Sequence, residues 1–412
     1  MKALQKAYLG FIVVRPLPQA IIGRTVVKTF PKWDGEDERR FRAVVDTKIN
    51  LFGIPLTVKK SLPFQQQDTV VAACATVALW SAFFRTAHMF GTPAVRPAAI
   101  TKAATSVLFQ ERALPSTGLT LEQMCQAIRS DGLEPEVFTL ENGKVPVLSW
   151  LRAYLELGIP LILGLKTPRG LHAVTVVGYR LAKSVQVDRE LHQDYHEAPS
   201  AARRIKMLYC HDDNLGPFAK FGVTADAEGG NVRLTSDVYG TDDAPAQLAF
   251  DYVVVPVYEK IRLGFPAVQS WVTVLDKALF PILRDELRDT REWDVALTTT
   301  DKFKRRVQTA PIPNEAKLEL LVEPQPRFMW QMSLTTGEGE AFRLYADATA
   351  FERSFPFRRA MIFDRELARN LTAILSAVAS REESAEAGVL AEFLQRELEH
   401  LEHRETAVAN GG

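Results

Sequence analysis

Residues 65–80 read QQQDTVVAACATVALW, and this stretch decides the fold. From Thr69 to Phe90 the chain is rich in apolar residues and good helix formers, with few turn residues. The pattern predicts a buried helix and places Cys74 near its N-terminus. A thiol there lies close to unpaired backbone N–H groups, whose partial positive charge favours a thiolate.

The chain after this helix predicts a second helix and then a set of strands. Thr120 and Gln123 have the spacing of a capping box, and apolar residues at helical spacing follow until Gly132. A third helix ends at Gly158. Helices followed by several strands are typical of the α+β class. The predicted strands cover residues 160–165, 172–181, 206–213 and 250–259.

Three domains are predicted from changes of pattern along the chain. Residues 1–62 form a β-rich unit with a strand over 7–14, residues 63–260 form the core, and residues 261–412 form a C-terminal α+β domain that ends in amphipathic helices. The polar residues 183–204 are interpreted as an insertion with no role in the core. In the C-terminal domain we expect helices over 267–287 and 365–405 and strands near 318–323, 327–334 and 341–349.

Composition excludes several classes of function. The chain has 412 residues, 47% of them hydrophobic, and its 50 Lys and Arg balance 50 Asp and Glu. The hydrophobic fraction is too high for a disordered chain. The balanced charge gives no general affinity for nucleic acid or anionic membranes. No apolar run is long enough for a membrane span, and no metal or nucleotide motif occurs, so no cofactor or metal is predicted. Three cysteines are too few for a disulfide framework and suggest a cytoplasmic location.

Histidine and carboxylate residues end or begin the predicted strands. His172 opens a strand directly after a turn containing glycine, and Asp212 and Asp213 close the next strand. A nucleophilic cysteine needs a histidine to share its proton and a third group to orient the imidazole. An upstream side-chain amide, together with the backbone N–H of Cys74, can form an oxyanion hole.

The order of these residues resembles the papain-like cysteine peptidase superfamily, in a bacterial branch similar to bacteriocin leader peptidases. The resemblance covers about residues 63–260. It rests on the glutamine and cysteine stretch quoted above and on three further motifs. These are GLTLEQMCQAIRSDGLEP (118–135), GIPLILGLKTPRGLHAVTVVGY (158–179) and YCHDDNLGPF (209–218).

The resemblance implies a role for each residue. Cys74 is the nucleophile, His172 the general base and later acid, Asp212 the orienting group and Gln67 the oxyanion donor. Asp213 or Asn214 are the alternatives to Asp212, and Gln65 or Gln66 the alternatives to Gln67. Cys125 and Cys210 are interpreted as core cysteines, and His211 as a solvent-facing neighbour.

The chain departs from the family pattern in several ways, and two of them lie near the proposed nucleophile. Asp68 stands where the family usually has its glutamine, and Ala75 follows the cysteine where glycine is usual. The expected function is that of a cysteine peptidase or amidase acting on a peptide or protein substrate through a thioester. The alternatives are an acyl transferase with the same thioester, and an inactive papain-like module that binds a protein partner through the C-terminal domain.

Overall fold

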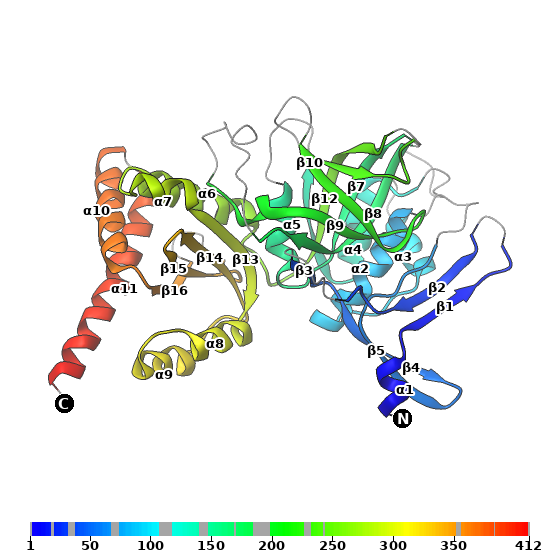
Figure 1. Cartoon of the computed structure of the whole chain (residues 1–412), viewed down its shortest axis with the longest axis horizontal. Helices are drawn as coiled ribbons and strands as arrows, with labels where there is room; N and C mark the ends of the chain where they lie inside the picture. Colours follow the sequence, from blue (N-terminus) through cyan, green and yellow to red (C-terminus); the bar gives the residue numbers. More distant parts are fainter. Residues whose placement is uncertain are drawn as a thin grey trace. The chain divides into compact units, whose positions relative to one another are not determined.

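A computed structural model describes the protein, and Figure 1 labels most of its helices and strands. The chain folds into two compact units, formed by residues 1–191 with 204–259 and by residues 192–203 with 260–412. Both contain helices and antiparallel sheet, so the predicted α+β class is confirmed. The structure describes residues 2–17, 20–31, 38–66, 74–106, 118–139, 147–168, 170–183, 198–225, 232–241, 244–351, 356–382 and 384–410.

A closed barrel of antiparallel strands forms the centre of the first unit. Its strands pair in the order β11-β10-β9-β8-β7-β12, and a further pairing of β11 with β12 closes the ring. The four strands predicted after Gly158 are β7, β8, β9 and β12 of this barrel. The barrel strands are β7 (Leu161–Thr167), β8 (Gly170–Leu181), β9 (Ile205–Asp212), β10 (Gly216–Ala225), β11 (Val232–Ser236) and β12 (Ala246–Tyr258).

Two more strands extend this sheet, and one glycine sets how closely its strands pack. β6 (Leu133–Thr139) pairs with β12, and β3 (Glu38–Phe41) pairs with β8. A Cβ at Gly164 in β7 would lie 2.4 Å from the ring of Tyr252 in β12. Glycine at this position therefore allows the tyrosine ring to lie across β7.

The predicted buried helix is α2 (Cys74–Phe90), which packs on the barrel. Its apolar residues form one core with Ile162, Ala173 and Val254 of the barrel strands. The same core includes residues of α3 (Pro97–Ala104) and α4 (Leu121–Ser130). The predicted capping box at the start of α4 is confirmed.

One hydrogen bond ties α2 to the strand that carries His172. Thr175 Oγ1 donates to the main-chain oxygen of Ala78 over 2.9 Å, and both residues are buried. Ala78 lies one helical turn after Cys74, and Thr175 lies three residues after His172. This bond therefore holds the beginnings of α2 and β8 close together.

The N-terminal residues are rich in strands, as predicted. A helix α1 (Lys2–Ala7) precedes β1 (Gly10–Val14), which pairs with β2 (Ile22–Val27), and β4 (Val45–Leu51) pairs with β5 (Ile54–Ser61). Thr25 and Phe64 form a bridge that joins β2 to the chain leading to α2. A further helix of this unit, α5 (Val147–Leu155), packs against β7.

The second unit is built on a four-stranded antiparallel sheet in the order β13-β14-β15-β16. Phe303 and Leu320, from two of its helices, pack against Met329 and Tyr345 of the sheet. Its elements are α6 (Phe265–Leu279), α7 (Asp285–Thr290), β13 (Glu292–Thr299), α8 (Thr300–Thr309), α9 (Asn314–Val322), β14 (Phe328–Thr336), β15 (Gly339–Asp347), β16 (Phe357–Ile362), α10 (Arg365–Glu382) and α11 (Ala385–Asn410).

One predicted strand and the predicted insertion were wrong, and the predicted helix over 267–287 is divided into α6 and α7. The apolar run at 318–323 belongs to helix α9 and not to a strand, because good helix formers follow Pro313. Part of the supposed insertion is buried, since Ala201 is 0% exposed and the main-chain oxygen of Pro199 accepts from Trp293 N–H over 2.7 Å. Residues 184–197 lie outside the described residues.

No helix in the described ranges is long and apolar enough to cross a membrane.

Candidate active site

Cys74 is the first residue of α2 as the structure describes it, and it is half-buried. The predicted oxyanion donor Gln67 and the neighbouring Asp68 lie outside the described residues. Of the alternative donors, Gln66 has its side-chain oxygen occupied, because Oε1 accepts the N–H of Ile22 over 3.1 Å. This glutamine joins the chain before α2 to strand β2.

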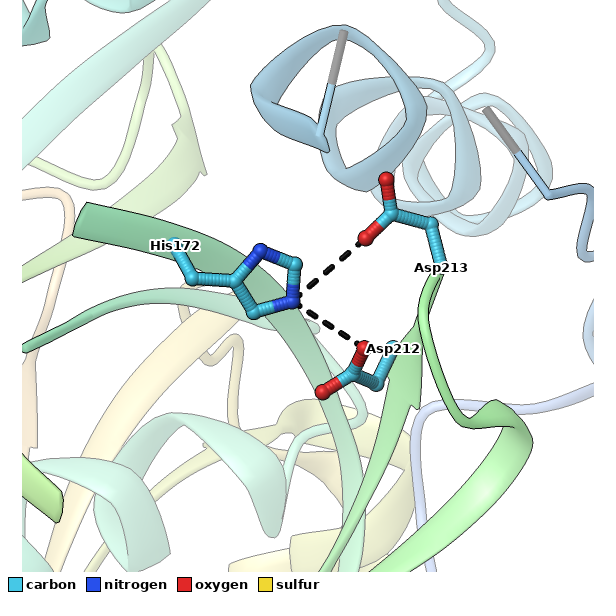
Figure 2. A group of neighbouring side chains, drawn as sticks. All are labelled: His172, Asp212 and Asp213. Atoms are coloured by element: carbon cyan, nitrogen blue, oxygen red, sulfur yellow. Dashed lines mark hydrogen bonds and ion pairs between the residues drawn. The ribbon is translucent and has the colours of Figure 1, made fainter. Parts of the chain in front are cut away.

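His172 lies at the start of β8 and reaches the end of β9. The two strands are antiparallel with Thr175 opposite His211, so residues just before Thr175 lie beside residues just after His211. His172 Nε2 is 3.0 Å from Asp212 Oδ1 (Figure 2). The side chains of His172 and Asp212 are 7% and 0% exposed, so this pair is shielded from water.

Asp212 is held in place by three further donors. Tyr239 O–H donates to Oδ2 over 3.0 Å, and the N–H groups of Asn214 and Leu215 donate to Oδ1 over 2.8 and 3.3 Å. Gly216 pairs with Asp212 across the turn at a φ of +114°, a conformation that favours glycine. The carboxylate is therefore fixed toward the imidazole by its own turn and by Tyr239.

The two alternatives to Asp212 also lie near the imidazole. Asp213 Oδ1 is 3.4 Å from His172 Nε2, and Asn214 Nδ2 is 3.5 Å from it (Figure 2 for the carboxylate). The Asn214 amide also donates to Tyr239 Oη over 3.1 Å. Asp212 is the nearest of the three to Nε2 and has the most hydrogen-bond partners.

Cys74 contacts the same histidine. The Cys74 thiol lies close enough to the imidazole of His172 to help raise the pKa of that histidine. Because Asp212 binds Nε2, the nitrogen that remains for the thiol is Nδ1. The imidazole of His172 thus lies between the side chains of Cys74 and Asp212, and these are the three residues that the sequence singled out.

The surroundings of His172 change its protonation. Burial lowers its pKa, but the hydrogen bond with Asp212, the nearby Cys74 thiol and the charges of the two aspartates outweigh burial and raise the pKa to about 10. Burial also raises the pKa of Asp213 to about 6, although the charge of His172 opposes this change. The raised pKa favours the charged imidazolium at neutral pH, and an imidazolium can stabilise a thiolate beside it.

The other two cysteines differ from Cys74 in their surroundings. Cys210 is 0% exposed, and burial raises its pKa well above the ordinary value. Cys125 is half-buried on α4, and burial raises its pKa as well. Neither environment favours a thiolate.

His211 is not solvent-facing, so that prediction was wrong. It is 3% exposed, its Nε2 donates to the main-chain oxygen of Leu62 over 3.0 Å, and its Nδ1 accepts the N–H of Phe218 over 3.2 Å. Burial lowers its pKa to about 4. This residue is a neutral core histidine that joins β9 to the chain before α2.

Sequence reasoning did not find Tyr239. It lies in the turn between β11 and β12, and no motif or spacing links it to the cysteine, the histidine or the aspartate. Only the closure of the barrel brings it to Asp212.

Comparison of the chain with protein-family models and with curated proteins finds no match.

Proposed function

We propose that this protein is a cysteine hydrolase that cleaves a peptide or amide bond. The observation that carries the proposal is a single imidazole, His172, placed between the thiol of Cys74 and the buried carboxylate of Asp212. This arrangement meets the three needs of an activated thiol: a partner base, an orienting group and a position at the start of a helix.

Each residue has one chemical task in the proposed reaction. The Cys74 thiolate attacks the carbonyl carbon, and the imidazolium of His172 then gives its proton to the leaving amine, which leaves a thioester. Water loses a proton to His172 as it attacks the thioester, and the acid product departs with the thiol restored. Asp212 holds the imidazole in place and stabilises its charged form.

The fold supports a papain-like assignment. The thiol is the first described residue of a helix that packs on an antiparallel barrel, and the barrel supplies the histidine and then the aspartate in chain order. This arrangement is similar to that of papain-like peptidases.

Selective alkylation tests the proposal. Native protein is treated with a low dose of iodoacetamide at pH 7, and the labelled cysteine is identified by peptide mapping. We expect Cys74 to react at least about 10-fold faster than Cys125, because only Cys74 has an imidazolium beside it. Cys125 is a matched control, since it is also half-buried on a helix of the same unit.

Variants complete this experiment. His172→Ala should slow the labelling of Cys74 to the rate of Cys125, while Cys74→Ser should abolish it. Equal labelling of all three cysteines, or labelling only after denaturation, would mean that Cys74 is an inert core cysteine.

A further inference from the structure

Asp213 is a buried aspartate whose carboxylate has no hydrogen-bond partner among the described residues. Its side chain is 2% exposed. Apart from its 3.4 Å ion pair with His172, this buried carboxylate has lost its hydration without receiving a hydrogen bond in exchange. Asp212, the preceding residue, accepts four hydrogen bonds from the groups named above and from His172.

The carboxylate of Asp213 points at a place where two other ligand atoms meet. Figure 2 shows Asp213 and Asp212 directed at the same nitrogen of His172. One nitrogen and two carboxylate oxygens, one from each residue, lie within 4.8 Å of one another, and all three residues are buried. The side chains thus converge on one point from the end of β9 and the start of β8.

The spacing of these atoms suits a divalent metal ion. Ligand atoms at roughly 2.1 Å from a tetrahedral zinc ion lie about 3.4 Å apart. His172 Nε2 is 3.0 Å from Asp212 and 3.4 Å from Asp213, which is close to that spacing. Two carboxylates side by side in a water-poor place repel each other, and a divalent cation would relieve that repulsion.

We propose that His172, Asp212 and Asp213 bind a divalent ion of the zinc type, and that the bound ion switches off the thiol chemistry. The second half of this inference rests on the proposed function, whereas the metal site does not. An ion on Nε2 displaces the proton there and leaves the remaining proton on Nδ1. The Cys74 thiolate takes up the displaced proton, and the imidazole, with its only free nitrogen protonated, has no lone pair with which to remove it again, so Cys74 is held as an unreactive thiol.

Zinc binding to the full chain tests the site. The protein is first treated with EDTA and desalted, and ZnCl₂ is then titrated by calorimetry at pH 7 in a buffer that does not bind zinc. We expect one tight site that Asp213→Asn and His172→Asn each weaken at least about 10-fold. Asp131→Asn is the matched control because Asp131 is another buried aspartate of the same unit whose oxygens accept no hydrogen bond within the described ranges. It should bind zinc as the wild type does.

A second variant excludes the thiol as the main ligand. Cys74→Ser should keep the zinc affinity, and Co²⁺ bound in place of zinc should show no charge-transfer band from sulfur. Equal zinc affinity in the wild type and Asp213→Asn would overturn the proposal, as would a loss of affinity in Cys74→Ser. If zinc binds as expected, it should also slow the labelling of Cys74 in the wild type by at least about 10-fold.

Different experimental results would contradict the hydrolase proposal and the metal-site proposal. A protein that binds zinc through Asp213 but has an unreactive Cys74 contradicts the hydrolase and leaves the metal site. A protein with a reactive Cys74 and no zinc site that depends on Asp213 contradicts only the metal site.

Discussion

Replacing Asp212 by asparagine is the sharpest test of how the site works. The substitution keeps the shape and one acceptor oxygen but removes the charge that lies 3.0 Å from His172 Nε2. Hydrogen bonds to charged groups contribute about 1.5–3 kcal/mol. A loss of about 2 kcal/mol from the imidazolium corresponds to a roughly 30-fold smaller population of the reactive ion pair.

The assay is the rate of alkylation of Cys74 by iodoacetamide at pH 7, with EDTA present and Cys125 as the internal reference. We expect Asp212→Asn to react about 30-fold more slowly than the wild type. Asp213→Asn removes the neighbouring charge without breaking a hydrogen bond. Its slowing of Cys74 alkylation should be at least about fivefold smaller than that of Asp212→Asn. Thermal denaturation of each variant shows whether its fold is intact. A folded Asp212→Asn variant that reacts within about twofold of the wild type would refute the role of Asp212.

Three further predictions concern other parts of the protein. Tyr239→Phe removes an O–H that donates to Asp212 over 3.0 Å, so the labelling of Cys74 should slow by about 10-fold across pH 6–8, and an unchanged rate would contradict a positioning role. Burial raises the pKa of Asp131 to about 6, above its ordinary value of 3.8, because the folded state favours the neutral carboxyl group. The folded state is therefore most stable with respect to this group below about pH 4, and it loses that stability as pH rises through 6 and the buried group ionises. Asp131→Asn should therefore be more stable than the wild type at pH 7.5 by up to about 3 kcal/mol in urea denaturation, with no such gain at pH 3.5. Phe303→Ala removes a ring that is 1% exposed and packs edge-on against Tyr345, which should cost about 3–5 kcal/mol in the same assay, and a cost below about 1 kcal/mol would mean that this core repacks.

Elements with a strong local signal were predicted well. The helix after Cys74, the capping box at Thr120 and the strand that His172 opens each depend on residues close together in the chain. Local signals failed at 318–323, because a short apolar run suits a helix as well as a strand.

The cysteine, the histidine and the acidic cluster, which the structure brings together, were singled out from sequence because each stands at the boundary of an element. Such a position is visible in the pattern of apolar residues and turns. The choice between Asp212 and its neighbours is different in kind, because adjacent residues share the same local pattern. Their roles differ through the N–H groups of the turn and the hydroxyl of Tyr239, which approach only Asp212.

The sequence by itself determined the α+β class, the helix that carries Cys74 and the strands that carry His172 and Asp212, because these follow from periodicity and turn residues. Only the tertiary structure decided that β11 pairs with β12, that Tyr239 reaches Asp212 and that Asp213 is buried without a donor. The physical reason is that these features come from pairings between segments far apart in the chain. Such pairings depend on how the whole barrel closes, and patterns within a short stretch of sequence do not predict them.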